Sequence, residues 1–387
     1  MKRPQIIHFL ALISNDFISL RASIGLSKKE NLFQDRDFEL ESPSFPIQSF
    51  GLLNSTAFNI KIIGLDKNKN SVFNKIYESD SFGGLNFKIP LTKETEKITI
   101  FQAFETKTLP GIEIHLGSFI PLVLKIPRKI IICDFDKTLV DTKYSTTKDV
   151  YHSLTKPLKS FPNVTKSINL LKGFINEHYH PFILSASPHF YENAIRDWLY
   201  QNEIFTAGIF LKDVRQVFSL WDGDLTPKDI TNQGLYKLNQ LLDIITMTDI
   251  PDELILMGDN FESDPVIYLA LSQMLQNQED PWVIWKNLKA HKDFNLSKKQ
   301  DAKFLSKIFQ IKTLINNRKL KEKDFQIRIQ IFIRKKLDSE KIKIPQSMEQ
   351  NNGLIESYVC EMKVTEKKKL KKKGSTEEKN KTDSPMT

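Results

Sequence analysis

The sequence is poor in cysteine and has no long apolar stretch, and each absence excludes a class of protein. Only two cysteines, Cys133 and Cys360, occur among 387 residues, so we expect neither a disulfide framework nor a cysteine metal site. No apolar run reaches the roughly eighteen residues that a membrane-spanning helix requires. The seven histidines show no spacing typical of metal ligands.

Positive charge is concentrated near the end of the chain. Residues 291–387 contain 25 Lys and Arg against 13 Asp and Glu, a net charge of +12. Since the whole chain carries +9, residues 1–290 sum to −3. A chain of this length usually exceeds a single core, so we expect two domains with extensions.

The first residues, MKRPQIIHFLALISND, have a basic start and a short apolar patch. Gln5 and His8 interrupt the patch and Asp16 follows it closely, which weakens the resemblance to a secretion signal. We therefore expect a strand or helix packed on the first domain, with a secretion signal as the alternative.

Alternation of apolar and polar residues with period two dominates the region from about 45 to 125. The segments AFNIKIIG, LNFKIP, KITIFQAFE and GIEIHL alternate in this way and are separated by turn-rich pieces. This pattern predicts an antiparallel, sandwich-like β domain, which we bound at residues 1–126.

After residue 127, short apolar strands alternate with amphipathic helices. IIICDFD, PFILSAS, AGIFLKD and ELILMGD are strand candidates that end in polar residues, and helical patterns lie between them. This order predicts an α/β domain over 127–290: a Rossmann-like parallel sheet with helices on both faces and a ligand site at the carboxyl ends of its strands.

The composition of the remaining chain changes near residue 346. Residues 291–345 combine a helical pattern, FLSKIFQIKTLI, with an alternating segment, FQIRIQIFIRK, and are expected to form a basic helical or mixed extension. Residues 346–387 end in a Lys-rich segment with few apolar residues, so we expect a disordered tail.

Candidate functional residues follow the predicted strands and one helix: Asp134, Asp136, Thr138, Ser185, Lys237, Asp259 and Asp264. Carboxylates at the end of a buried strand repel one another, so a counter-charge is required. A Mg²⁺ ion would supply it, with Asp134 and Asp259 as direct ligands, Asp264 bound directly or through water, and the backbone carbonyl of Asp136 as a further ligand.

The spacing of the DFDKT segment suggests separate roles for its acids. In a strand end, residues i and i+2 face the same side, so Asp134 can attack a phosphoryl group while Asp136 acts as general acid and base. Ser185 and Thr138 can donate hydrogen bonds to the phosphate, and Lys237 can neutralise its charge.

Two of these assignments have competitors nearby. Lys228 competes with Lys237, which is preferred because of its register with the leucines of its helix. Ser187 competes with Ser185, which directly follows the apolar triplet. Asp141 is interpreted as a loop residue instead of a fourth ligand.

These motifs resemble those of the haloacid dehalogenase superfamily of phosphotransferases, in the same order along the chain. More narrowly, SASPHFY, GIFLKD and GDNFESDPVIY resemble the catalytic domain of the actin-patch type phosphatidate phosphatases. The resemblance implies a Mg²⁺-dependent phosphatase with an aspartyl-phosphate intermediate. Lys212 and Asp213 resemble an arginine and aspartate pair of that family, and either shape the substrate side or form a structural ion pair.

Two positions depart from the family pattern. Lys137 stands where a second aspartate is usual, and His189 replaces a tryptophan after SASP. Both departures bear on the lipid substrate more than on the phosphatase chemistry.

The motifs therefore predict a phosphomonoester hydrolase, and the family resemblance implies phosphatidate or a related lipid phosphate as its substrate. The alternatives are a different monoester, such as a phosphoprotein or polynucleotide end, or a non-catalytic adaptor that binds lipid or phosphate. The lysines at 367–369 and 371–373 could contact anionic membranes or only solubilise the chain. Nucleic acid is not favoured, because no aromatic residues lie among these lysines. We expect a cytoplasmic protein, for which peripheral membrane contact and an N-terminal secretion signal are alternatives that the sequence leaves open.

Overall fold

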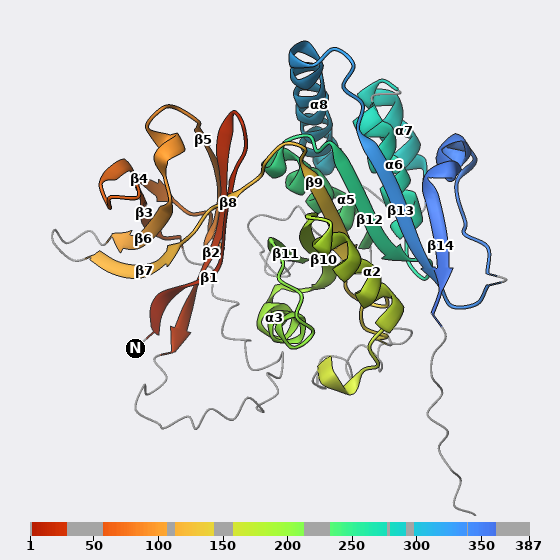
Figure 1. The fold of residues 1–387 in the computed structure, drawn as a ribbon, viewed down its shortest axis with the longest axis horizontal. Coiled ribbons are helices and arrows are strands. Elements are labelled where there is room, and N and C mark those ends of the chain that lie inside the picture. Colours follow the sequence, from red (N-terminus) through yellow and green to blue (C-terminus); the bar gives the residue numbers. More distant parts are fainter. Residues whose placement is uncertain are drawn as a thin grey trace, which may run out of the picture.

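The computed structural model describes residues 2–28, 57–106, 113–142, 158–212, 233–276, 279–291, 298–338 and 340–360. These residues form a β-rich N-terminal region and an α/β region, which lie side by side in Figure 1. No helix among them is both long enough and apolar enough to span a membrane.

The N-terminal region contains two four-stranded sheets, with strand orders β5-β2-β1-β8 and β4-β3-β6-β7. All neighbours are antiparallel except the short β8, which pairs in parallel with β1. The strands are β1 (Lys2–Ile13), β2 (Phe17–Lys28), β3 (Asn59–Leu65), β4 (Ser71–Glu78), β5 (Gly84–Pro90), β6 (Ile100–Thr106), β7 (Glu113–Phe119) and β8 (Leu122–Val123), with a 3-10 turn at Thr95–Lys97.

The alternating segments explain how these two sheets share a core. Ile18 and Leu20 of β2 are buried together with Ile60 and Ile62 of β3 and Phe101 of β6. Their neighbours in sequence face outward, as period-two alternation requires. The predicted antiparallel β region is therefore confirmed, and the apolar patch near the N-terminus forms strand β1.

The α/β region is built on one six-stranded sheet with the order β11-β10-β9-β12-β13-β14, in which every neighbouring pair is parallel. Its strands are β9 (Lys129–Asp134), β10 (His180–Pro188), β11 (Gly208–Lys212), β12 (Glu253–Asp259), β13 (Arg328–Lys335) and β14 (Ile355–Val359). Its helices are α2 (Thr165–Asn176), α3 (Glu192–Gln201), α5 (Gln233–Thr248), α6 (Asp264–Gln276), α7 (Pro281–Ala290) and α8 (Lys298–Lys321), with 3-10 segments Leu158–Ser160, His189–Tyr191 and Gln346–Leu354.

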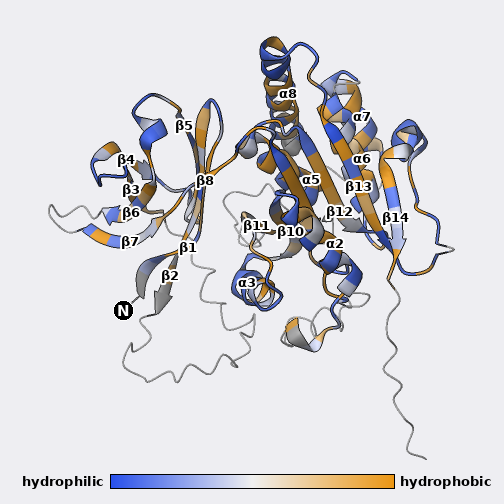
Figure 2. Cartoon of the chain, in the orientation of Figure 1, coloured by the Kyte–Doolittle hydropathy of each residue, from blue (hydrophilic) through white to orange (hydrophobic). Residues whose placement is uncertain are grey.

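Alternate residues of strand β9 belong to different cores. Ile130 and Ile132 pack with α5, α6, α7 and α8, whereas Ile131 and Cys133 pack with α2 and α3. The central strands are accordingly apolar along their length, as Figure 2 shows. This arrangement confirms the predicted parallel sheet with helices on both faces.

The C-terminal segments do not follow the predicted boundaries. Strands β13 and β14 add to the edge of the same sheet, so the α/β unit does not end at residue 290. The prediction of a disordered tail from residue 346 is wrong for residues 346–360. Tyr358 is buried in the core that contains α2 and α3, and its hydroxyl is hydrogen-bonded to the hydroxyl of Ser167. Residues 361–387, which include the lysine clusters, lie outside the described residues.

The two regions pack directly against each other. Leu10 and Leu12 of β1 join the core that contains helix α5. Arg21 of β2 donates a hydrogen bond to Gln240 of α5 at 3.1 Å and lies over the ring of Phe210. The β region thus covers one side of the parallel sheet near β11 and α5.

Candidate active site

Three aspartates from separate parts of the chain meet at the carboxyl edge of the parallel sheet. Asp134 ends β9, Asp259 ends β12, and Asp264 is the first residue of α6. One oxygen from each of these carboxylates lies within 4.8 Å of the others, and all three residues are completely buried. Parallel neighbours bring strand ends together, as the sequence pattern predicted.

Gly258 allows this close approach. A Cβ atom at position 258 would lie 2.5 Å from the Asp264 carboxylate, which real side chains do not tolerate. The same carboxylate accepts a hydrogen bond from the backbone amide of Asp259 at 3.2 Å. The glycine therefore lets Asp264 fold back against the strand that carries Asp259.

Lys237 of helix α5 lies among these acids. Its ammonium is 2.8 Å from Asp134 Oδ1, 2.7 Å from Asp264 Oδ1 and 3.2 Å from Glu262 Oε2. Thr138 donates a hydrogen bond to the second oxygen of Asp134 at 3.1 Å. Both oxygens of the Asp134 carboxylate are thus oriented by neighbouring side chains.

The net effect of burial and neighbouring charges is to raise the pKa values of both the acids and the lysine in this cluster. Burial, reinforced by neighbouring carboxylates, raises the pKa of Asp134 and of Asp259 well above the usual range of an aspartate. Burial alone would lower the pKa of Lys237, but attraction to Asp134, Asp264 and Glu262 outweighs it and raises that pKa. The lysine therefore stays positively charged. Its single charge does not compensate the burial of Asp134 and Asp259, so the pKa values of these two carboxyl groups stay raised.

The donor set fits a divalent cation. Asp134 Oδ1 forms an ion pair with Lys237, but the geometry of this contact is not that of a hydrogen bond. Asp259 Oδ2 is buried and has no hydrogen-bond partner among the described residues. Each oxygen therefore keeps lone pairs free for a cation. Carboxylate oxygens are the ligands that hard cations such as Mg²⁺ prefer, although the cluster itself does not identify the metal.

Asp136 faces a different set of groups. Its Oδ2 accepts hydrogen bonds from Ser185 and Ser187, each at 2.7 Å, and its Oδ1 accepts one from Thr142 at 3.2 Å. The two serines therefore bind the same carboxylate oxygen, and the preference for Ser185 over Ser187 as a phosphate donor stays a prediction. Three hydroxyl donors fix the orientation of Asp136.

The structure brings together every residue proposed from the sequence, in two adjacent groups. Asp134, Thr138, Lys237, Asp259 and Asp264 form one group, and Asp136 with Ser185 forms the other. Their catalytic roles stay predictions.

The other residues considered from the sequence lie in different places. The competing Lys228 lies outside the described residues, as does Asp213. Lys212 is buried with its ammonium 5.8 Å from the ring centre of Tyr236. Asp141 pairs with Arg334, and the group of carboxylates that lie within 4.8 Å of one another consists of Asp134, Asp259 and Asp264.

Sequence reasoning missed one ion-pair chain. Glu262, in the loop after β12, accepts from Lys137 at 3.1 Å and from Lys237 at 3.2 Å. Burial would raise the pKa of Glu262, but the two lysines outweigh it and lower that pKa. The available signal was that opposite charges, Lys137 and Glu262, stand in the two loops that follow β9 and β12.

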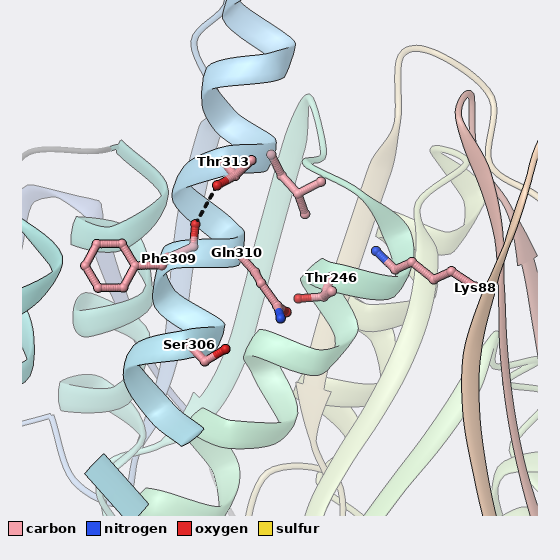
Figure 3. Close-up of a pocket in the computed structure, with 7 residues that line it drawn as sticks. Lys88, Thr246, Ser306, Phe309, Gln310 and Thr313 are labelled. Carbon is pink, nitrogen blue, oxygen red and sulfur yellow. Dashed lines mark hydrogen bonds between the residues drawn. The ribbon is translucent and has the colours of Figure 1, made fainter. Parts of the chain in front are cut away.

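Two adjoining cavities lie away from this cluster, between β5, α5 and α8. Their volumes are about 530 and 360 Å³, and Lys88, Thr246, Ser306 and Gln310 line both. Figure 3 shows Lys88 pointing from the β region toward Thr246 and the side chain of Gln310. They belong to the contact between the two regions and contain no residue of the aspartate cluster.

The segment that carries the aspartate cluster matches a known family model. Residues 129–281 match the model described as phosphatidate phosphatase APP1, catalytic domain. The match confirms, for this segment, the resemblance to the phosphatidate phosphatase catalytic domain that its motifs predicted. The search of curated proteins found no match to the chain.

Solved structures resemble the chain only weakly. A chain of the Pnkp1/Rnl/Hen1 complex is 18% identical with a TM-score of 0.26, covering 34% of this chain and 39% of that one. A Bifidobacterium dentium beta-glucuronidase is 8% identical with a TM-score of 0.26, covering 90% of this chain and 45% of that one. This chain thus spans less than half of either structure, and such TM-scores support no conclusion about fold or function.

Proposed function

We propose that this protein is a Mg²⁺-dependent phosphatidate phosphatase that acts through an aspartyl-phosphate intermediate. The observation that carries the proposal is the buried cluster of Asp134, Asp259 and Asp264, contacted by Lys237, within a segment that matches the APP1 catalytic-domain model. The family description supports the substrate, and the arrangement of the residues supports the chemistry.

Asp134 attacks the phosphorus atom. Lys237 and Thr138 hold its two oxygens at 2.8 and 3.1 Å, so the carboxylate is aligned before the substrate arrives. Attack forms the bond between the carboxylate oxygen and phosphorus, and the bond between phosphorus and the ester oxygen breaks. Lys237 neutralises charge on the transferring group, a contribution typically worth 10²–10³-fold per donor.

Asp136 acts as the general acid and then as the general base. Its carboxyl group gives a proton to the departing diacylglycerol oxygen and then takes one from the water that hydrolyses the aspartyl phosphate. Ser185, Ser187 and Thr142 keep it oriented during both steps.

The cation has a supporting role. A Mg²⁺ ion held by Asp134, Asp259 and Asp264 would screen repulsion between the carboxylates and the phosphate dianion.

Phosphate release from a panel of substrates tests the proposal. The panel contains phosphatidate vesicles, soluble phosphate monoesters, a phosphopeptide and a 3′-phosphorylated oligonucleotide, each with Mg²⁺ and with a chelator. We expect Mg²⁺-dependent release that is fastest from phosphatidate, and a loss of at least ~10³-fold in Asp134→Asn. Asp338→Asn, which changes an exposed aspartate, is the matched control and should retain activity.

Two outcomes would contradict different parts of this proposal. Faster release from a soluble ester, the peptide or the oligonucleotide would exclude phosphatidate as the preferred substrate while preserving the chemistry. Equal release by the wild type and Asp134→Asn would exclude the proposed nucleophile.

A further inference from the structure

Arg334 lies beside the aspartate cluster although it comes from a distant part of the chain. Strand β13 pairs in parallel with β12, and Arg334 stands opposite Asp259 in that register. The residue is 2% exposed. It lies outside residues 129–281, so the family match says nothing about it.

The guanidinium of Arg334 binds the loop that follows Asp134. Its Nη1 donates to the backbone carbonyl of Lys137, and both Nη atoms donate to Asp141 Oδ1 at 3.1 and 3.2 Å. A charge-assisted pair of this kind fixes direction as well as distance. One buried side chain therefore holds two points of the 135–142 loop.

The backbone at Lys137 has an unusual conformation that needs such support. Its φ is +59°, in the left-handed region that residues with a side chain seldom adopt. Its amide donates to the carbonyl of Val140 at 2.7 Å, while its carbonyl accepts from Arg334. The peptide planes on both sides of Lys137 are thus held.

The hydrogen bonds at Lys137 also fix the orientation of the Asp136 carbonyl. The amide of Lys137 and the carbonyl of Asp136 belong to one rigid peptide plane, so the orientation of one determines that of the other. The Asp136 carbonyl is the backbone ligand that we predict for the cation. Arg334 acts on this plane through the conformation of Lys137.

Arg334 also contacts the second loop of the cluster. Its backbone carbonyl accepts from the amide of Asn260 at 3.0 Å, directly after Asp259. Its guanidinium lies 5.8 Å from the ring centre of Phe261. The residue therefore links the loop after β9 to the loop after β12, between which the cation would sit.

We propose that Arg334 is a positioning residue that sets the geometry of the 135–142 loop against Asp259, and thereby the metal affinity and turnover of the site. This inference rests on the proposed function for its effect on turnover, but its effect on metal affinity can be measured without any substrate. Contacts behind metal ligands typically contribute 10–100-fold to affinity or activity.

The central experiment compares Arg334→Lys with Arg328→Lys. The second variant is a matched control, because Arg328 lies on the same face of β13 but at its other end, where its side chain is 76% exposed and pairs with Glu253. Mn²⁺, as a paramagnetic probe of the Mg²⁺ site, is titrated into the full-length chain and followed by electron paramagnetic resonance. We expect roughly tenfold or greater weakening in Arg334→Lys and no change in Arg328→Lys.

Turnover and stability separate positioning from simple folding. We expect Arg334→Lys to lower kcat on phosphatidate with KM within about twofold, since the substrate itself does not touch Arg334 in this proposal. Thermal denaturation gives the folded fraction for correcting each value. If Arg334→Lys fails to fold, Asp141→Asn removes the carboxylate charge that Arg334 binds, and we expect it to weaken Mn²⁺ severalfold.

Wild-type Mn²⁺ affinity in folded Arg334→Lys would overturn the inference, and so would wild-type affinity in Asp141→Asn if only that variant folds. A wild-type chain that binds no Mn²⁺ would also overturn it. If the wild type binds Mn²⁺ but hydrolyses no ester, the proposed function fails while the affinity comparison still decides the role of Arg334.

Discussion

The two edges of the parallel sheet both bury charged side chains, but only one edge balances them. At the amino edge, Arg128 lies 3.4 Å from Asp249, and its backbone amide bonds Asp252 at 2.6 Å. Arg318 pairs with the other oxygen of Asp252 at 2.8 Å. Two arginines therefore face two aspartates.

The carboxyl edge has an excess of negative charge. Among the described residues, five carboxylates, at Asp134, Asp136, Asp259, Glu262 and Asp264, lie with the two lysines Lys137 and Lys237, which leaves three formal negative charges in excess. The neighbouring pair of Arg334 and Asp141 adds no net charge. Buried charge of one sign costs stability unless something neutralises it. The amino edge is thus neutral by itself, whereas the carboxyl edge would be neutralised by a bound cation.

Removing Arg128 should have the largest effect on stability. The side chain is fully buried, so Arg128→Met leaves Asp249 without its partner, and we expect a loss of about 3–5 kcal/mol in the free energy of unfolding. Urea denaturation measures this loss. Arg328→Met, which removes an exposed arginine, should cost less than about 1 kcal/mol. Equal losses in the free energy of unfolding of Arg128→Met and Arg328→Met would show that the buried position of Arg128 does not increase its contribution to stability.

The second prediction concerns the unbalanced edge. Adding Mg²⁺ at about 100 times its dissociation constant should stabilise the wild type by about 2.7 kcal/mol, because only the folded chain brings the three aspartates together. Thermal denaturation with and without Mg²⁺ measures the gain. Asp259→Asn should lose most of it, whereas Arg328→Met should keep it. An equal gain in Asp259→Asn would place the cation elsewhere.

The balanced and unbalanced edges also differed in how well the sequence predicted them. Asp134 and Asp259 end apolar strands, and Lys237 lies in a regular helical pattern, so periodicity places all three at one edge. Arg128 and Arg318 gave no such signal, because an isolated arginine next to a strand or within a basic helix looks exposed. Their burial depends on contacts between elements far apart in sequence.

The C-terminal strands show a second limit of sequence reasoning. FQIRIQIFIRK predicted a strand, but periodicity does not say which sheet that strand joins. Parallel pairing of β13 with β12 requires the long connection through α6, α7 and α8, and basic composition obscured it. The assignment of residues after 290 to an extension therefore failed, and Arg334 was overlooked with them.

A smaller effect is predicted for Glu192, a buried acid that, unlike the aspartate cluster, has basic side chains beside it. Glu192 of α3 lies 3.1 Å from His8 of β1 and 2.5 Å from Arg196. Burial would raise the pKa of Glu192, but these two neighbours outweigh it and hold that pKa below its ordinary value of 4.5. This direction is opposite to that of Asp134 and Asp259, as balance of charge requires.

The sign of the pH dependence follows from that direction. A carboxyl group with a lowered folded pKa stabilises the fold above its unfolded pKa and loses this contribution as pH falls through the folded value. Glu192→Gln should therefore cost about 1 kcal/mol near neutral pH, and its difference from the wild type should shrink below about pH 4.5. Urea denaturation across pH measures the difference, with Glu203→Gln, an exposed glutamate, as control. A difference that grows as pH falls would mean that the contacts with His8 and Arg196 do not stabilise the ionised form.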